Sequence, residues 1–322
     1  MVMKKYLSHF PLLIACVLCI SVVLNLYLGY HHWLEYQQSR DKAIETSSKY
    51  PLLSPRIFAE QKNDVLINFL PLRNALREYT MGFDGALGIY FEYLPSGTSI
   101  GINEKKDFIA ASLIKVPVVM AFFRQQEVTG LDQMGSVVRL EARDMDKGFG
   151  KLWERGVGTE VSYDDLIRLT LVDSDNTAVL AISRNVHEQY FEEVYQGLDV
   201  DFIKQNDRLI VSPKEYASIL KSLYLSAVIS KASSQKILTY LTEHSSYDKL
   251  VDGVPQGVPV ANKFGMYQEG AVHQDCGIVY VPKRPYILCI MSESSEQEAR
   301  ERIRMVSQKV YQFVANVNTN VQ

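Results

Sequence analysis

The chain has 322 residues, of which 47% are hydrophobic and 11% are aromatic, so it holds enough apolar side chains for a sizeable core. Lys and Arg number 34 against 37 Asp and Glu, which gives a net charge of -3 at pH 7. This balance excludes the strongly basic surface by which proteins bind nucleic acid, so we expect no nucleic-acid partner.

The first distinctive element is an apolar segment at residues 10–30, which contains 21 residues without a charge. A helix of that length, rising about 1.5 Å per residue, spans roughly the 30 Å core of a bilayer, so we expect a transmembrane signal anchor. Lys4 and Lys5 precede it, and the positive-inside rule makes residues 1–9 a cytoplasmic tail. A cleaved signal peptide is the alternative, but no Ala-x-Ala site follows. We therefore predict a single-pass protein of the cell membrane with an extracytoplasmic catalytic domain.

Residues 31–62 are polar and contain two prolines, which is typical of an extracytoplasmic tether. The folded domain is predicted over residues 63–318. Its first part has apolar residues at helical spacing over residues 65–76, and a strand-like run follows at residues 86–94.

The middle of this domain carries helical patterns, and its end carries strand patterns. Apolar residues recur at spacings of three and four in the segments 112–126, 163–172, 177–185 and 213–225. Runs of β-branched and aromatic residues occupy 258–264, 277–281 and 286–291, before a long amphipathic helix at 296–317. Strands near both ends thus flank a helical middle. We predict an α+β fold in which one antiparallel sheet carries the helices.

Cys276 and Cys289 lie on two predicted strands that a Pro-containing turn joins into a hairpin. The register that we predict for this hairpin places the two cysteines diagonally rather than opposite each other, which is less suited to a disulfide. The sequence therefore leaves a disulfide open.

Five Ser-x-x-Lys motifs occur in the chain, and the motif at Ser112 has the context that a catalytic serine needs. It opens a strongly apolar predicted helix, on which Ser112 and Lys115 share one face. The partial positive charge at a helix amino end favours a developing alkoxide. Burial lowers the pKa of a lysine, so that its amine can accept the serine proton. We therefore predict Ser112 as a nucleophile and Lys115 as its base.

Two more short motifs follow. Residues 174–176 read Ser-Asp-Asn and lie between two predicted helices, where a loop can present a hydroxyl and an amide to a cleft. Helix capping is the alternative interpretation, and Asp175 suits it best. Residues 263–265 read Lys-Phe-Gly and lie on a predicted strand, where a glycine lets the backbone approach a ligand closely.

In this order the three motifs resemble the set that marks class A β-lactamases and penicillin-binding serine peptidases. The resemblance implies a β-lactamase/transpeptidase-like fold. It also implies roles: Ser112 is the acylated nucleophile, Lys115 its base, Ser174 a proton relay to the leaving nitrogen and Lys263 an electrostatic anchor. The implied substrate contacts are Asn176, Gly265, the backbone N–H of Met266, which joins that of Ser112 in an oxyanion hole, and Gly150 in a Gly-Phe-Gly loop.

Two departures from that set shape the predicted function. The β-lactamases place a deacylating Glu in a Glu-x-x-Leu-Asn motif, whereas residues 197–212 contain no Glu. Asp199, Asp201 and Asp207 are the alternative bases in that region. Phe264 replaces the usual Thr or Ser of the third motif, so no hydroxyl is available there for a substrate carboxylate.

We therefore predict a membrane-anchored serine hydrolase that forms an acyl-enzyme with D-alanyl peptide bonds of peptidoglycan or with β-lactams. A true β-lactamase is one alternative, and a non-catalytic domain that binds cell-wall peptide is another. We expect a monomer that needs no cofactor.

Two other patterns in the sequence suggest alternative sites. Residues 97–101 match the Gly-x-Ser-x-Gly elbow of α/β-hydrolases around Ser99, but no apolar helix follows as the elbow requires. His273, Asp275 and Cys276 offer the donor types of a metal site. Neighbours on a strand point to alternate faces, so we expect no metal there.

Overall fold

The computed structural model describes residues 10–49, 51–52, 67–83, 86–131, 133–198, 200, 204–205, 208–267 and 271–316. The chain divides into two compact units, which are described separately. The first comprises Met1–Pro51 and Pro55–Phe58, and the second comprises Leu52–Ser54 and Ala59–Gln322.

A single helix, α2 (Phe10–Lys49), makes up nearly all of the described first unit. It continues past residue 30 because residues 31–49 contain neither Gly nor Pro and are rich in helix formers. The first part of the predicted tether is therefore helical, and residues 53–62 of it lie outside the described residues. Among the described residues, no helix combines the length and apolarity needed to cross a membrane. The predicted transmembrane span at residues 10–30 is thus not supported.

The second unit begins with α3 (Leu70–Thr80) and the strands β1 (Leu87–Tyr93) and β2 (Thr98–Ile102). Its larger helices are α4 (Lys115–Thr129), α5 (Tyr163–Leu171), α6 (Asn176–Ser183), α7 (Glu188–Leu198), α8 (Pro213–Leu225) and α9 (Lys231–Leu241). It ends with β8 (Val260–Tyr267), β9 (Val272–Val279), β10 (Tyr286–Glu293) and α10 (Glu296–Asn316). The short strands are β3 (Phe108–Ile109), β4 (Val137–Arg139), β5 (Glu160–Ser162), β6 (Lys204–Gln205) and β7 (Arg208–Val211). The 3₁₀ helices are η1 (Ala111–Ile114), η2 (Ala142–Asp144), η3 (Leu152–Arg155) and η4 (Val251–Gly253).

Five strands form one antiparallel sheet in the order β2-β1-β10-β9-β8. Strand β1 pairs with β10, with Leu87 opposite Ser292, so the two ends of the domain share the centre of the sheet. This confirms the predicted α+β fold. Strand β8 lies at an edge, where one side of its backbone has no strand partner within the sheet.

The register of the β9–β10 hairpin corrects the diagonal arrangement predicted for its cysteines. Val279 pairs with Tyr286, which sets the connecting loop at residues 280–285 and brings Cys276 directly opposite Cys289. The two cysteines form a disulfide. Lys263 on β8 lies opposite Cys276 on the other side, so the disulfide and this lysine occupy one cross-strand row.

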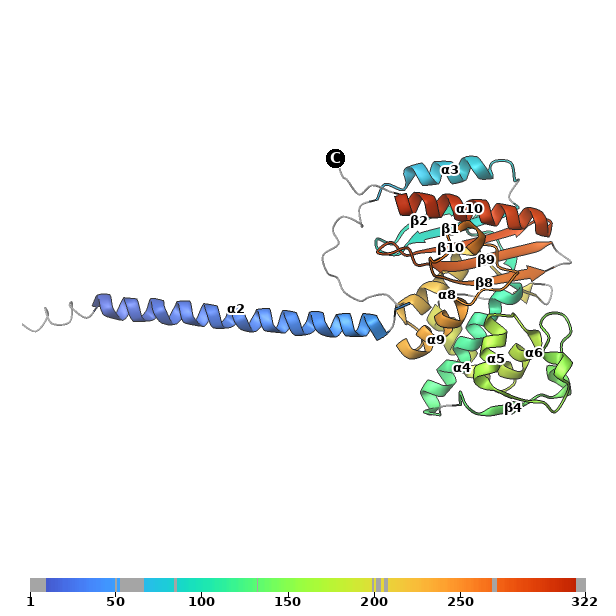
Figure 1. The fold of residues 1–322 in the computed structure, drawn as a ribbon, viewed down its shortest axis with the longest axis horizontal. Helices are drawn as coiled ribbons and strands as arrows, with labels where there is room; N and C mark the ends of the chain where they lie inside the picture. The colour runs from blue at the N-terminus through green and yellow to red at the C-terminus, as the bar shows by residue number, and fades with distance from the viewer. Residues whose placement is uncertain are drawn as a thin grey trace, which may run out of the picture. The chain divides into compact units, whose positions relative to one another are not determined.

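Helices cover both faces of the sheet (Figure 1). Helices α3 and α10 lie on one face, and α8 lies on the other beside the remaining helices of the middle segment. On the face toward α3 and α10, the alternate residues Leu87–Tyr93 of β1 and Tyr286–Ile290 of β10 are hydrophobic and fully buried. Together with helix residues they form the main core, whose members include Phe69, Leu72, Leu76, Ile89, Phe91, Leu288, Ile290, Ile303, Val306 and Val310.

Local sequence signals explain several helix boundaries. Helix α8 begins at Pro213 because Ser212 and Glu215 form a reciprocal capping box, with Ser212 N to Glu215 Oε2 at 2.8 Å and Glu215 N to Ser212 Oγ at 3.3 Å. Helices α7 and α9 were not predicted. Helix α7 carries Tyr190, Val194 and Leu198 at a spacing of four on its buried side, a signal that was available.

Gly253 of η4 lies against the backbone of α10, where a side chain has no room. A Cβ at this position would lie 2.5 Å from the Arg304 carbonyl oxygen and 2.6 Å from the Gln308 nitrogen. We expect Gly253→Ala to lower the free energy of unfolding by roughly 1–3 kcal/mol, measured by urea denaturation. Gly135→Ala is the matched control, because no atom lies within 4 Å of its Cβ position. Equal losses in both variants would contradict this packing argument.

Candidate active site

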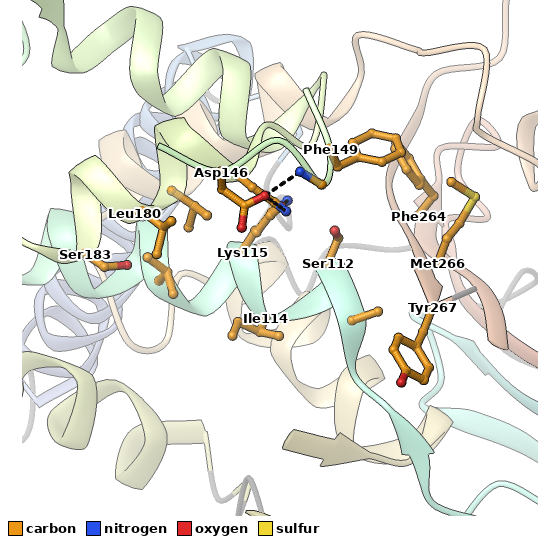
Figure 2. Close-up of a pocket in the computed structure, with 15 residues that line it drawn as sticks. Ser112, Ile114, Lys115, Asp146, Phe149, Leu180, Ser183, Phe264, Met266 and Tyr267 are labelled. Atoms are coloured by element: carbon orange, nitrogen blue, oxygen red, sulfur yellow. Dashed lines mark hydrogen bonds between the residues drawn. The ribbon is translucent and has the colours of Figure 1, made fainter. Parts of the chain in front are cut away.

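A cavity of about 520 Å³ lies where the helical segment meets the edge strand β8 (Figure 2). Ser112, Lys115, Asn176, Phe264 and Met266 all line it. Residues from the three motifs, which are far apart in the sequence, therefore meet in one place. Lys263 and Gly265 are not among the residues that line it.

Ser112 lies in the 3₁₀ turn η1, directly before α4, and Figure 2 shows its hydroxyl pointing into the cavity. Ala111 has a φ of 46°, in the left-handed region that residues with a Cβ rarely adopt. Such strain persists only where the surrounding structure enforces it, and it is common at functional sites. The turn thus presents Ser112 at the amino end of a helix, as the sequence predicts.

Gly265 allows β8 to pass close to this turn. A Cβ at Gly265 would lie 3.3 Å from Leu113 Cγ and 3.4 Å from the Ala110 carbonyl oxygen, which is a tight fit. The sequence predicts a close approach of backbone to a ligand at this glycine. The structure shows instead a close approach to the turn that holds Ser112.

Lys115 is buried, and its amine is surrounded by oxygens of the Ser-Asp-Asn loop. Its Nζ donates to the Ser174 carbonyl oxygen and to Asn176 Oδ1 at 2.7 Å, and it lies 3.1 Å from Ser174 Oγ. Burial lowers the pKa of Lys115 well below its usual value, and the nearby Lys263 lowers it further. Asp175 and Asp146 act in the opposite direction. The side chain is thus held in place beside Ser112 and is shifted toward its neutral form.

The loop itself is held by Asp175 and by two left-handed backbone positions. Asp175 caps α6 by accepting from Ala178 N at 2.9 Å, and it also accepts from Leu152 N at 2.8 Å. This confirms the predicted capping role. Ser174 has a φ of 56°, and Gly150 has a φ of 88° and packs against the Asp175 carboxylate. Gly150, predicted as a substrate contact, therefore supports the loop and is not among the residues that line the cavity.

Asp146 lines the cavity and was missed by the sequence analysis. Its Oδ1 accepts from Gly148 N at 2.6 Å and from Asn176 Nδ2 at 3.0 Å, which turns the amide oxygen of Asn176 toward Lys115. The available signal was the Asp-x-Gly pattern, which is typical of a side chain that closes its own turn. Its link to Asn176, 30 residues away, has no local signature.

Lys263 is buried behind the cavity wall, and within the described residues its Nζ has no hydrogen-bond partner. The amine lies 4.0 Å from the ring centroid of Phe264. Burial lowers the pKa of Lys263 to about 7, against the opposing effect of Asp248, Asp275 and Asp173. The cation predicted as an electrostatic anchor is thus covered by the ring that replaces the usual hydroxyl.

The competing sites from the sequence find no support. Ser99 lies within strand β2 and not at a strand-to-helix elbow. Cys276 is bonded to Cys289, and His273 and Asp275 point to the opposite face of β9 from Cys276. Asp199, Asp201 and Asp207 lie outside the described residues.

Comparisons with known proteins agree with this geometry. Residues 71–314 match the model of the beta-lactamase enzyme family. Beta-lactamase 3 of Bacillus cereus is 24% identical over 234 residues, which cover 67% of this chain and 72% of that protein. A beta-lactamase of Bacillus licheniformis is 25% identical over 256 residues, which cover 74% of this chain and 81% of that protein.

Solved structures share the fold. PBP-A has a TM-score of 0.70 and 22% identity, and the match covers 77% of this chain and 97% of PBP-A. The beta-lactamase from Sphaerobacter thermophilus DSM 20745 has a TM-score of 0.69 and 20% identity, covering 78% and 99%. A PBP-A mutant in an acyl-enzyme complex with penicillin G has a TM-score of 0.69 and 23% identity, covering 77% and 97%.

The buried Lys263 predicts a pH dependence of stability. Its pKa falls from 10.5 to about 7 on folding, so between these values the unfolded chain binds more protons than the folded chain. The contribution of Lys263 to the free energy of unfolding therefore rises with pH from about 7 to 10. We expect Lys263→Met to be more stable than the parent at pH 7 and to lose part of this rise, measured by urea denaturation at several pH values.

The exposed Lys214 provides the control for that experiment. Lys214→Met removes the same charge without removing a buried amine, and we expect it to keep the parental pH dependence. An unchanged slope in Lys263→Met would show that Lys263 titrates alike in the folded and unfolded chains.

Proposed function

Since the chain belongs to the beta-lactamase enzyme family, we propose that it forms an acyl-enzyme through Ser112, with D-alanyl peptide bonds of peptidoglycan or β-lactam amide bonds as acyl donors. The coarser assignment, a serine hydrolase of the broad β-lactamase and penicillin-binding type, follows from the family. The observation that carries the proposal is the buried amine of Lys115, held by Ser174 and Asn176 in the cavity that Ser112 lines.

In the proposed acylation, Ser112 Oγ attacks the carbonyl carbon of the donor while neutral Lys115 accepts the hydroxyl proton. The lowered pKa of Lys115 favours the neutral amine that this step needs. The backbone N–H groups of Ser112 and Met266 are the proposed donors to the oxyanion that develops on the carbonyl oxygen. Both residues line the cavity.

The tetrahedral intermediate then collapses, and the bond between the carbonyl carbon and the leaving nitrogen breaks. The leaving nitrogen takes up a proton through the Ser174 hydroxyl, which Lys115 resupplies across the 3.1 Å between Nζ and Oγ. Asn176 is proposed to hold the donor through the second hydrogen of its Nδ2, because Asp146 accepts the first. The product is an ester between Ser112 Oγ and the acyl group.

We favour a peptidase over a true β-lactamase because we expect slow hydrolysis of the ester that a β-lactam forms with Ser112. Hydrolysis of the ester requires a base that activates water, and Asp146 is the carboxylate among the described cavity residues. Its Oδ1 already accepts hydrogen bonds from Gly148 N and Asn176 Nδ2, so this oxygen is engaged in holding the loop. A non-catalytic binding domain is less well supported, because binding alone needs neither a strained nucleophile turn nor a buried lysine.

We further propose that the domain acts outside the cytoplasm. The uncharged segment at residues 10–30, preceded by Lys4 and Lys5, supports export, and the Cys276–Cys289 disulfide is typical of an oxidising compartment. Residues 10–30 serve in this proposal as the membrane anchor. The monomer expected from the sequence is part of this proposal.

Acylation is tested by intact mass of the full chain incubated with excess benzylpenicillin. We expect a stable adduct with the mass of the whole drug, because acylation opens the ring without losing a fragment and deacylation is slow. Ser112→Ala should abolish the adduct. Ser99→Ala, at the rejected hydrolase elbow, should leave it unchanged. Rapid loss of the adduct with release of opened drug would identify a true β-lactamase instead.

Export is tested by the redox state of Cys276 and Cys289 in cells. We expect the full chain to resist a maleimide gel shift at these cysteines, whereas a chain that lacks residues 1–30 stays in the reducing cytosol and reacts. Equal oxidation of both chains would argue against export through the amino-terminal segment.

A further inference from the structure

Three aromatic rings from distant parts of the sequence pack together at the β8 side of the cavity. Phe149 comes from the loop between η2 and η3, Tyr247 from the turn before η4, and Phe264 from β8. The ring centroids of Phe149 and Tyr247 are 5.0 Å apart, those of Tyr247 and Phe264 are 5.6 Å apart, and those of Phe149 and Phe264 are 5.8 Å apart. Every pair is thus in contact, and we call this cluster the aromatic wall. Figure 2 shows two of its members, Phe149 and Phe264.

Three basic side chains on this side of the cavity pack on aromatic rings. Lys263 Nζ lies 4.0 Å from the centroid of Phe264, and Lys249 Nζ lies 5.9 Å from the same centroid. Arg208 packs on the ring of Tyr267, 4.2 Å from its centroid. None of these three side chains is among the residues that line the cavity. Among the described residues, Lys115 is the basic side chain that lines it. The β8 side of the cavity therefore presents ring and thioether surface instead of positive charge.

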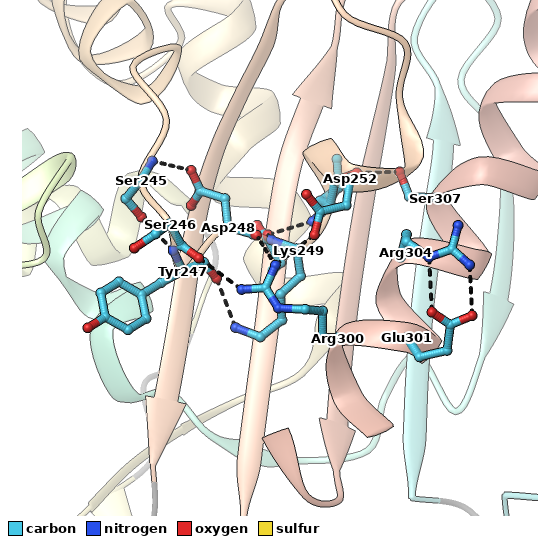
Figure 3. A network of polar contacts seen from close by, with 12 residues as sticks. Ser245, Ser246, Tyr247, Asp248, Lys249, Asp252, Arg300, Glu301, Arg304 and Ser307 are labelled. Atoms are coloured by element: carbon cyan, nitrogen blue, oxygen red, sulfur yellow. Dashed lines mark hydrogen bonds and ion pairs between the residues drawn. The ribbon is translucent and has the colours of Figure 1, made fainter. Parts of the chain in front are cut away.

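A polar network behind the aromatic wall holds Tyr247 in place (Figure 3). Arg300 donates to the Ser246 carbonyl oxygen at 2.9 Å and to the Asp248 carbonyl oxygen at 3.1 Å, so the backbone is tied on both sides of Tyr247. Lys249 Nζ donates to the Tyr247 carbonyl oxygen at 2.9 Å.

Phe149 is fixed from the opposite side. Its carbonyl oxygen accepts a hydrogen bond from Asn176 N at 2.9 Å, so the position of Phe149 depends on the Ser-Asp-Asn loop. Phe264 is 2% exposed and belongs to β8. The aromatic wall is therefore a built feature of the cavity and is fixed to the same loop that holds Lys115.

We propose that the aromatic wall selects acyl donors whose group beyond the scissile bond is uncharged and apolar, in place of donors that carry a carboxylate there. The proposal rests on the acylation of Ser112 proposed above and narrows its donors. A carboxylate against these rings loses its water and gains no cation or hydroxyl in return, whereas an apolar group gains contact with the rings. A D-alanyl bond followed by an uncharged group fits this cavity better than one followed by a free terminal carboxylate.

The test compares benzylpenicillin with its methyl ester, two donors that share the same reactive ring and differ in one charge. The rate constant for adduct formation on Ser112 is measured by intact mass of the full chain. Each value is divided by the rate of ring opening of that compound in buffer, which removes differences in intrinsic reactivity. We expect the parent to prefer the methyl ester by about tenfold or more.

Variants of the aromatic wall separate charge from bulk. Phe264→Thr uncovers Lys263 and adds a hydroxyl, so the preference should fall at least threefold, whereas Phe264→Leu keeps an apolar cover and should retain it. Tyr247 is 41% exposed, so Tyr247→Ala is expected to fold even if Phe264→Thr does not. This substitution removes one ring of the aromatic wall, so the preference for the methyl ester should fall, as in Phe264→Thr.

Three outcomes would overturn the proposal. A parent that reacts with the free acid at least as fast as with the ester has no selection against charge. Equal shifts in Phe264→Thr and Phe264→Leu would mean that packing alone is being measured. If neither compound forms an adduct on Ser112, the proposed function itself fails, whereas adducts without preference defeat this inference and leave that function standing.

Discussion

The burial of two lysine amines at the junction between the helices and the sheet is the constraint on which the site depends. Lys115 and Lys263 both lose most of their contact with water. Burial lowers the pKa of each amine, and the nearby Lys263 lowers the pKa of Lys115 further. Lys115 is compensated by the oxygens of Ser174 and Asn176, whereas Lys263 faces a ring. Such an arrangement costs stability, which is acceptable where a site gains a neutral amine from it.

The surrounding fold supplies the rigidity that this arrangement needs. Asp175 caps α6 and fixes the loop around Lys115, and Gly265 lets β8 pack on the turn of Ser112. The Cys276–Cys289 disulfide ties β9 to β10 in the row that Lys263 begins. Ser112, Lys115 and the edge strand are thus positioned by packing that lies outside the cavity itself.

Features that depend on neighbouring residues could be predicted from the sequence. Helix α8 spans the predicted residues 213–225 because Ser212, Pro213 and Glu215 specify its start within four positions. Strands β1 and β10 follow their apolar runs, and the motif at Ser112 opens a buried helix as expected. Signals of this kind survive folding because tertiary contacts reinforce them.

Features that depend on distant residues could not be predicted. The contact of Asp146 with Asn176 and the packing of Phe149 on Tyr247 join segments whose local patterns carry no trace of the partner. The cysteine register failed for a related reason, because the position of a hairpin loop sets it and a shift by one residue changes every pairing. The covering of Lys263 by Phe264 required knowing on which side of β8 the rings gather.

The pairing of β1 with β10 also constrains how the chain reaches this state. The pair Leu87 and Ser292 joins residues from nearly opposite ends of the domain sequence. Strand β1 therefore has β2 as its only partner in the sheet until β10 has formed. Loop closure over such a distance is slow, and exposed strand edges attract other chains in the meantime. The helical middle can form earlier from local contacts, but the cavity needs β8. We therefore expect the cavity to be completed late in folding.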